Sequence, residues 1–171
     1  MNNFIETDPK ELDFNAFSKI GDEWMLLSSG ESENFNLMTA SWGGVGVLWG
    51  KNVAFIFVRP ARYTYLFIEK NDTFSICFFD KKYKNALNFC GSKSGRDFDK
   101  AKECNLSPIF IDNTVAYEEA SIIITCKKMY ASDINKDDML DSSIMDCYKN
   151  NDFHRMYIGE ILKVYRKNKA E

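Results

Sequence analysis

The chain has 171 residues, a formal net charge of −3 at pH 7 and 45% hydrophobic residues. This length suits a single domain over residues 1–171, and the hydrophobic fraction is sufficient for a buried core. The slightly negative charge argues against non-specific nucleic-acid binding through a basic face.

The expected elements are short. A helix is predicted over residues 9–20, followed by strands at 24–28, 35–41 and 53–58. A helix at 63–70, a strand at 74–79 and helices at 82–89 and 98–104 come next. The last third carries a strand at 120–129, a helix at 137–148 and a strand at 154–164.

This order favours a mainly β architecture. Many short strands with interspersed short helices fit an antiparallel barrel or sandwich with helical inserts. The strand–helix alternation of the first half also suggests a doubly wound α/β sheet. Against that alternative, the last third has little crossover, and no glycine-rich turn opens a helix after the first strand.

Residues 34–49 read NFNLMTASWGGVGVLW, an apolar strand with polar insertions followed by glycines. Strand alternation predicts one face with Asn36, Met38, Ala40 and Trp42, and the other with Thr39 and Ser41. Glycines allow the backbone to approach a flat ligand, whose carbonyl edge can accept bonds from exposed amides. A strand that ends in a flexible loop explains the same pattern, because glycine spacing alone is weak evidence.

Residues 58–64 read VRPARYT and place Arg59 and Arg62 where a strand ends and a helix begins. A phosphate suits this position, since first-turn amides point outward and the helix dipole favours an anion. Arginine adds a planar fork of donors. A surface helix start with solvated arginines is the alternative.

Residues 90–100 read CGSKSGRDFDK and suggest a second anion-binding loop. Ser92, Ser94 and Gly95 supply small polar positions, and Lys100 supplies a point charge. Asp97 is equally explained as the N-cap of a helix from residue 98, which needs no ligand.

The sequence gives no sign of a membrane segment, a disulfide framework or a metal site. No run approaches the roughly 20 apolar residues that cross a bilayer, and the first residues lack the order of a signal peptide. Five scattered cysteines without a CxxC pair favour reduced thiols, and one histidine with no Cys/His cluster makes zinc unexpected. We therefore expect a cytoplasmic protein with no membrane, nucleic-acid or metal partner.

Five stretches in order resemble one family. NLMTASWGG, VRPARYTYLFIE, CGSKSGRDFDK, VAYEEA and HRMYIGEI span residues 36–161. Together they are similar to the flavin reductase-like proteins with an FMN-binding split barrel, a group that includes flavoredoxins. The resemblance implies an FMN-binding split β-barrel with short peripheral helices, usually a homodimer with FMN near the subunit contact.

The resemblance also implies roles for individual residues. Those expected along the isoalloxazine and ribityl chain are Asn36, Met38, Thr39, Ala40, Ser41 and Trp42. Those expected at the phosphate are Arg62, Tyr63, Thr64, Ser94 and Lys100, with Arg59 as a helper. Two further positions near the flavin are Phe79 and Cys90.

His154 is the single histidine. The resemblance puts it near the isoalloxazine or the substrate opening, as a hydrogen-bond donor and the one candidate catalytic residue. A strand-start histidine satisfied by a neighbour is the alternative. No protein nucleophile is expected, because the flavin carries the electron chemistry.

The function implied is that of an FMN-dependent oxidoreductase, which transfers hydride or electrons from NADH or NADPH to a flavin or another acceptor. The electron partners are small molecules or proteins. Three alternatives stay open: a flavoredoxin-like FMN carrier fed by a protein donor, a non-enzymatic flavin-binding protein, and a haem-binding split barrel.

Overall fold

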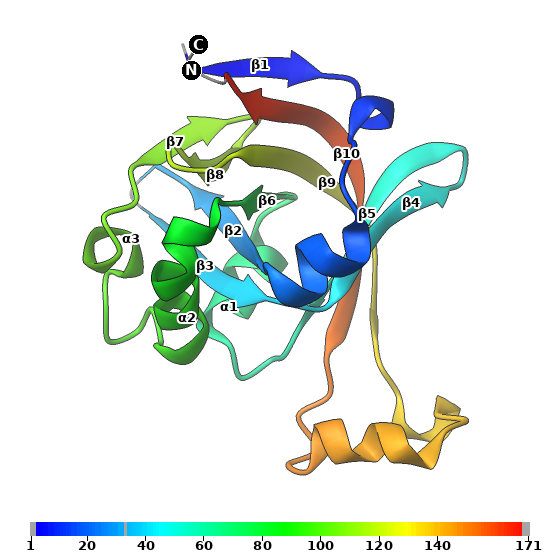
Figure 1. Ribbon diagram of the computed structural model, residues 1–171. Helices are drawn as coiled ribbons and strands as arrows, with labels where there is room; N and C mark the ends of the chain where they lie inside the picture. The colour runs from blue at the N-terminus through cyan, green and yellow to red at the C-terminus, as the bar shows by residue number, and fades with distance from the viewer. Residues whose placement is uncertain (1–2, 33, 169–171) are drawn as a thin grey trace.

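One curved antiparallel sheet organises the chain, in a computed structural model that describes residues 3–32 and 34–168 (Figure 1). Its strand order is β3-β2-β6-β9-β10-β5-β4, and β1 pairs with the outer end of β10. The bounds are β1 (Phe4–Thr7), β2 (Met25–Glu31), β3 (Asn34–Ala40), β4 (Gly43–Leu48), β5 (Lys51–Val58), β6 (Thr73–Phe78), β9 (Ile122–Asp133) and β10 (Arg155–Lys167). The chain is thus mainly β, as expected.

Short elements cover this sheet. The α-helices are α1 (Tyr63–Lys70), α2 (Lys84–Ser92) and α3 (Lys100–Glu103), and a separate hairpin pairs β7 (Pro108–Ile111) with β8 (Thr114–Tyr117). Single turns of 3-10 helix form η1 (Pro9–Glu11), η3 (Lys81–Tyr83) and η4 (Lys136–Asp138), and a longer one forms η5 (Ser142–Tyr148). A π-helix forms η2 (Phe17–Asp22).

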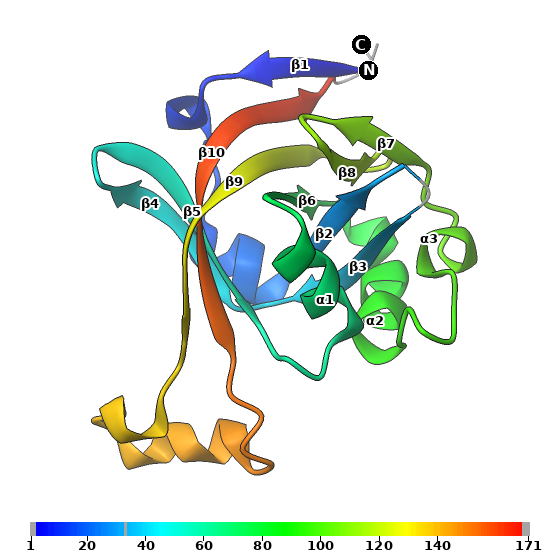
Figure 2. The same cartoon turned by 180° about the vertical axis from the view of Figure 1, so that it is seen from behind.

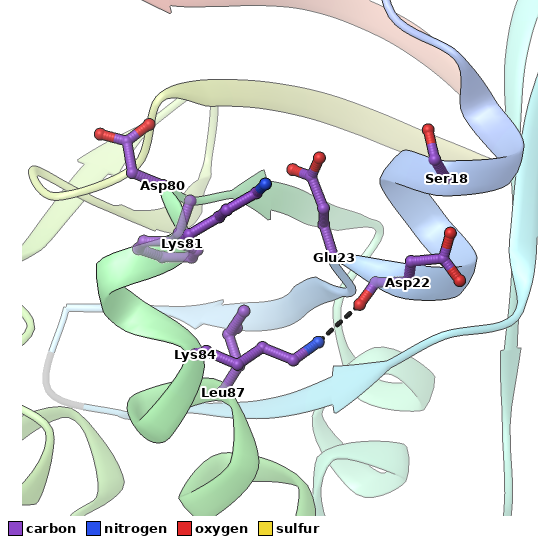
Figure 3. A pocket seen from close by; sticks show the side chains of 8 residues that line it. Ser18, Asp22, Glu23, Asp80, Lys81, Lys84 and Leu87 are labelled. Carbon is purple, nitrogen blue, oxygen red and sulfur yellow. Dashed lines mark hydrogen bonds between the residues drawn. The ribbon is translucent and has the colours of Figure 1, made fainter.

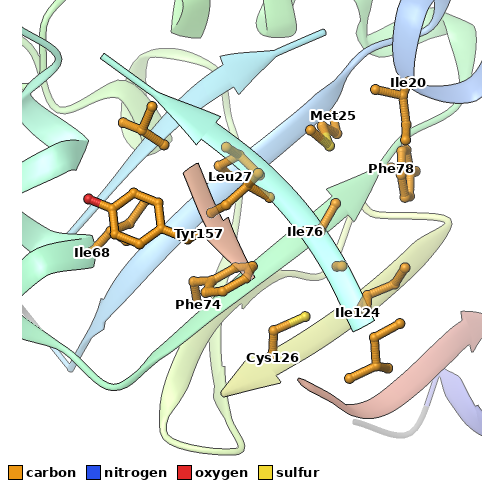
Figure 4. Packing of buried hydrophobic residues seen from close by; sticks show 14 of the residues in the cluster. Ile20, Met25, Leu27, Ile68, Phe74, Ile76, Phe78, Ile124, Cys126 and Tyr157 are labelled. Carbon is orange, nitrogen blue, oxygen red and sulfur yellow. The ribbon is translucent and has the colours of Figure 1, made fainter. Parts of the chain in front are cut away.

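The central strands bury both faces of the sheet. Because successive side chains of a strand point to opposite sides, Leu27 enters one core cluster and Leu26 enters another. Figure 4 shows the first cluster, to which Leu27, Ile76 and Ile124 of the sheet and Ile68 of α1 all belong. The second cluster lies under α2 and the β7–β8 hairpin. All six residues of β6 are consequently buried.

One glycine lets the longest strand pass close to the first cluster. A Cβ at Gly159 of β10 would lie 2.6 Å from the Phe74 ring. The β9–β10 register also shifts between Ile158 and Gly159. The strand therefore bends at a position where no side chain fits.

Beyond this bend, β9 and β10 run out of the barrel and carry the arm, which we define as residues 134–154 (Figures 1 and 2). At its base the Ile134 amide donates to the His154 carbonyl at 2.9 Å. Arg155 also bonds Asp133 at 2.9 Å across the two strands. The arm thus begins from a firmly paired hairpin.

Several expected elements need correction. The prediction of a single helix over residues 9–20 is wrong, because the chain forms η1 and η2 as separate elements. The Asn15 side chain accepts a hydrogen bond from the Phe17 amide where η2 begins. Residues 43–48, read as a glycine loop, form β4. Its turn to β5 is a tight one at Trp49 and Gly50, both with positive φ.

The remaining differences lie at caps and turns. The helix expected from residue 98 begins at Lys100, because Asp99 and not Asp97 accepts an amide of the first turn. The helix expected over 137–148 is two 3-10 segments, with Asp141 capping the second. Strand β1 and the β7–β8 hairpin were missed, while helix 63–70 is confirmed.

Three global features complete the description. Among the residues that the structure describes, no helix has the length and apolar character needed to cross a membrane. Within the same residues, no group of three or more acidic, histidine or cysteine side chains is arranged around a metal position. All five cysteines are free thiols.

Candidate functional site

Two adjoining hollows lie beside β3, one against the start of α1 and the loop after α2, the other against β5 and the base of the arm. The first, of about 110 Å³, is the cationic hollow, lined by Met38, Ala61, Arg62, Tyr63, Thr64, Ser92, Lys93, Ser94, Gly95 and Lys100. The second, of about 250 Å³, is the aromatic hollow, lined by Met38, Thr39, Ala40, Ser41, Trp42, Phe57, Arg59, Arg62 and His154. Met38 and Arg62 line both. The structure thus brings most of the predicted site residues into one continuous region.

Two cations of the cationic hollow are fixed by the end of α2. Arg62 donates to the Gly91 carbonyl at 2.7 Å, and Lys100 Nζ donates to the Cys90 carbonyl at 3.2 Å. These carbonyls belong to the helix end that lacks intrahelical donors and attracts positive charge. Helix-end carbonyls therefore hold the two side chains, and no carboxylate of the described residues pairs with either.

Lys100 is buried, with 4% of its surface exposed. Burial lowers the pKa of Lys100 to about 8, and the neighbouring Arg62 pushes that pKa in the same direction. A buried ammonium beside a second cation is costly until an anion arrives. The hollow is consequently matched to a ligand group of negative charge.

The start of α1 supplies further donors. Arg62 occupies the N-cap position, and no side chain there bonds the first-turn amides. Such amides are a ready site for an anion. Beside them, Thr64 Oγ1 accepts a bond from Asn36 Nδ2 at 3.2 Å. Asn36 thus lies behind the cationic hollow rather than along the aromatic one.

Gly95 closes the other side of the cationic hollow. A Cβ at this position would collide with the Asn36 side-chain amide. Arg96 lies over the Tyr63 ring, with its guanidinium carbon 4.6 Å from the ring centroid. The loop after α2 therefore approaches β3 and α1 as closely as backbone permits.

The aromatic hollow has a different character. Trp42 is 44% exposed, and its ring lies 4.9 Å from the His154 ring, centroid to centroid. Phe57 of β5 adds a third ring. The Thr39 hydroxyl donates to the Leu87 carbonyl at 2.5 Å, so α2 already occupies it. This hollow combines flat ring surfaces with polar side chains, several of which already bond protein groups.

His154 enters the aromatic hollow from the base of the arm. Its Nδ1 lies 3.0 Å from the Tyr148 hydroxyl. Burial lowers the pKa of His154 to about 4, and the charges of Arg59 and Arg62 act in the same direction. The imidazole is therefore neutral at pH 7.

Arg59 reaches towards the arm. Its guanidinium donates to the Cys147 carbonyl at 2.8 Å and to the Asp152 carbonyl at 3.3 Å. It also lies over the Tyr148 ring, 5.3 Å from the centroid. Arg59 lines the aromatic hollow, but its hydrogen bonds tie β5 to the arm.

Besides Asn36, two expected residues, Phe79 and Cys90, line neither hollow. Phe79 belongs to the second core cluster and lines a third cavity of about 460 Å³ between η2 and α2 (Figure 3). There Lys84 donates to the Asp22 carbonyl, as the figure shows. Cys90 is fully buried, with its sulfur 3.7 Å from that of Cys104. Burial raises the pKa of the Cys90 thiol to about 12.

Sequence reasoning did not single out Phe57 or Tyr148. Alternation along β5 could have indicated Phe57, since it shares a face with Phe55 in a strand next to the glycines. Nothing in the sequence marks Tyr148, because its role depends on how the arm folds back on Arg59 and His154.

Fold and hollows together define a β-barrel protein suited to a flat ligand with an anionic end. The chain belongs to the flavin reductase-like family, whose domain model matches residues 17–171. A search of curated proteins found no match to the sequence.

Solved structures share this fold. Flavoredoxin from Methanosarcina acetivorans is 19% identical, with a TM-score of 0.69 over 85% of this chain and 69% of that one. An FMN-binding domain of flavin reductase-like enzymes from Shewanella baltica is 15% identical, with a TM-score of 0.70 over 96% and 78%. The NADH:FAD oxidoreductase of Streptomyces globisporus is 13% identical, with a TM-score of 0.63 over 84% and 74%. The expected split β-barrel is thereby confirmed.

Proposed function

We propose that this protein binds FMN, with the phosphate in the cationic hollow and the isoalloxazine in the aromatic hollow. We further propose that it is an FMN-dependent oxidoreductase that accepts electrons from NADH or NADPH. The observation that carries the proposal is that the two hollows adjoin, with Met38 and Arg62 in the lining of both. A ligand that is ionic at one end and aromatic at the other fits that arrangement.

At the phosphate end, Arg62 and Lys100 supply charge and the first-turn amides of α1 supply neutral donors. Charge-assisted bonds to phosphate are roughly twice as strong as neutral ones. Thr64 and Ser94 add hydroxyls at the rim of the same hollow. Tyr63 lines it and is held by Arg96.

At the ring end, Trp42 and Phe57 supply flat surfaces, and the end of β3 supplies backbone groups at Ala40 and Ser41. When bound, FMN supplies the hydride and electron transfer, and the protein supplies position and electrostatics. Neutral His154 can donate a hydrogen bond here without adding a charge. The rings of the hollow keep water from the buried side of the site.

The choice of NADH or NADPH rests on the family and on the likeness to an NADH:FAD oxidoreductase. The likeness to a flavoredoxin supports a second candidate, an FMN electron carrier that receives electrons from another protein. The aromatic hollow is compatible with both, since exposed Trp42 leaves one side open.

The test is the visible spectrum of the purified chain with added FMN, before and after anaerobic NADH or NADPH. We expect saturable FMN binding and bleaching of the flavin band by one of the two donors. Bleaching by neither donor, with FMN bound, would favour the carrier. Absence of FMN binding would refute the proposal as a whole.

We also propose that the protein is a homodimer. Four large apolar side chains lie exposed on β9, on β4 and on the β4–β5 turn, namely Tyr130 (45%), Met129 (38%), Val47 (73%) and Trp49 (57%). Trp49 and Tyr130 contact each other, with centroids 6.2 Å apart. Exposed apolar groups gathered in this way are typical of interaction surfaces.

Light scattering after size exclusion tests this assembly. We expect a dimer mass for the natural sequence and a monomer mass for Trp49→Glu. Lys127→Glu is the control, because it changes charge on β9 at an exposed position. A natural chain that stays monomeric at all concentrations would contradict the proposal.

A further inference from the structure

At the base of the arm lies Tyr148, a residue to which the proposed function assigns no role. Tyr148 is buried, with 3% of its surface exposed, at the end of η5. Its ring stacks on Phe153 at 4.7 Å between centroids, and Arg59 covers it from another side. Its hydroxyl meets His154 Nδ1 at 3.0 Å. Packing on two sides and a hydrogen bond leave Tyr148 little freedom.

We propose that Tyr148 is a positioning residue that fixes His154 as the neutral tautomer with its proton on Nε2. The arm then determines which polar atom the aromatic hollow presents. The consequence for ligand contact, that Nε2–H donates to a carbonyl oxygen of a flat bound ring, rests on the proposed function. The assignment of the tautomer does not rest on the proposed function.

The direction of the hydrogen bond between Tyr148 and His154 follows from the donors and acceptors that each group has. Burial raises the pKa of the Tyr148 hydroxyl, so it keeps its proton at pH 7. Among the described residues, His154 Nδ1 is the one partner of that hydroxyl. If Nδ1 carried the proton, the buried tyrosine proton would have no acceptor, which is costly. With Nδ1 as acceptor, the tyrosine proton and Nδ1 are each satisfied by the other.

The second ring nitrogen is then free for a ligand. Within the described part of the chain, nothing bonds His154 Nε2, and His154 lines the aromatic hollow. The groups whose charges act on the imidazole are Arg59, Arg62 and Asp152. The two arginines oppose protonation, so Nε2 offers an uncharged donor. An uncharged donor is matched to a carbonyl oxygen more than to a carboxylate, which would gain from a full positive charge.

The single histidine makes the test direct. In the full chain labelled with ¹⁵N-histidine, long-range ¹H–¹⁵N spectra report two ring nitrogens of one residue. At pH 7 we expect a protonated Nε2 and an unprotonated Nδ1, with no protonation of the ring until well below pH 6. A natural protein with the proton on Nδ1 overturns the proposal, and this result needs no variant.

Tyr148→Phe removes the hydroxyl and keeps the ring that stacks on Phe153. We expect a mixture of the two tautomers and a higher pKa for His154. Tyr165→Phe is the matched control, since it deletes another buried tyrosine hydroxyl, bonded to Asp112 and far along β10. An unchanged, fully populated Nε2–H tautomer in Tyr148→Phe would overturn the positioning role.

Addition of FMN separates this inference from the proposed function. We expect the Nε2 resonance to move on saturation in the natural protein, and to move less in Tyr148→Phe. FMN that binds by absorbance and leaves Nε2 unmoved would overturn the contact with the ring. FMN that does not bind would overturn the proposed function, while the tautomer result stands on the apo spectra.

Discussion

The cationic and aromatic hollows differ in how they are built. In the cationic hollow, Arg62 and Lys100 both donate hydrogen bonds to carbonyls at the end of α2. The aromatic hollow collects its rings from β3, β5 and the base of the arm. The cationic side chains of the first hollow therefore come from two short segments, whereas the rings of the second come from elements that only the tertiary structure brings together.

Removing the charges of Arg62 and Lys100 should give the largest difference between the roles of the two hollows in ligand binding. In Arg62→Ala/Lys100→Ala we expect FMN affinity to fall by at least about 100-fold, because two charge-assisted bonds of roughly 1.5–3 kcal/mol each are lost. Riboflavin, which lacks the phosphate, should weaken by only a few-fold. Fluorescence titration with both ligands measures the difference.

Lys102→Ala is the control for that variant, since Lys102 lies exposed on α3 beside Lys100. It should leave both affinities unchanged. If the double variant weakens FMN and riboflavin equally, the phosphate does not occupy the cationic hollow.

Gly95→Ala tests the close approach behind the same hollow. The added methyl would displace the Asn36 side chain and break its bond to Thr64. A buried amide without its partner costs about 1–3 kcal/mol, so we expect a lower Tm and FMN binding weaker by roughly 10-fold. Gly21→Ala, with open space around it, should change neither. Normal Tm and affinity in Gly95→Ala would mean that the loop has room to relax.

The pH dependence of binding sharpens the comparison further. The pKa of Lys100, about 8, lies below its ordinary value, and a bound phosphate must raise it. FMN affinity should therefore fall as pH rises above about 8, by up to about 10-fold per pH unit until the pKa of the complex is reached. Titrations from pH 7 to 10 measure this fall. Lys100→Arg should remove it, and riboflavin should not show it at all.

The same linkage predicts a stability change without ligand. Between about pH 8 and the ordinary lysine pKa, the unfolded chain binds a proton at Lys100 that the folded chain lacks. The contribution of Lys100 to the free energy of unfolding should thus rise with pH across that window, and the difference in that free energy between the natural chain and the Lys100→Arg variant should change accordingly. Urea titrations at several pH values give the comparison.

The smallest effect is expected in the aromatic hollow. Trp42→Ala removes one partly exposed ring, and aromatic pairs contribute about 0.5–1.5 kcal/mol beyond their buried area. FMN and riboflavin should both weaken by roughly 3- to 10-fold, and by the same factor. A selective loss of FMN in Trp42→Ala would mean that the two hollows have been assigned to the wrong ends of the ligand.

The contrast between the hollows also explains what the sequence could predict. Helix 63–70 and its preceding arginines follow from a strand end and a helix start that are adjacent in the chain. Ser94 and Lys100 are marked by composition within one loop. Such local signals account for the cationic hollow, whose ligand remains a prediction until it is measured.

The errors arose where a local signal was ambiguous or absent. The glycines of β4 permit loop or strand equally, and pairing with β5 decides between them. The β7–β8 hairpin turns at Asp112 and Asn113, a pair that tolerates positive φ and could have been recognised. Phe79 points into the second core cluster because of the strand register, which the sequence alone does not set. Tyr148 reaches His154 only through the folded arm.

The arm has one practical consequence. Of the five cysteines, Cys147 is exposed, Cys104 is partly covered, and Cys77, Cys90 and Cys126 are buried. The backbone carbonyl of Cys147 accepts a hydrogen bond from Arg59. A mild thiol reagent should therefore modify the natural sequence first at Cys147, without any mutation. A dye attached there would lie on the arm at the residue that bonds Arg59, which lines the aromatic hollow, and a change in its fluorescence on addition of FMN would report binding in that hollow.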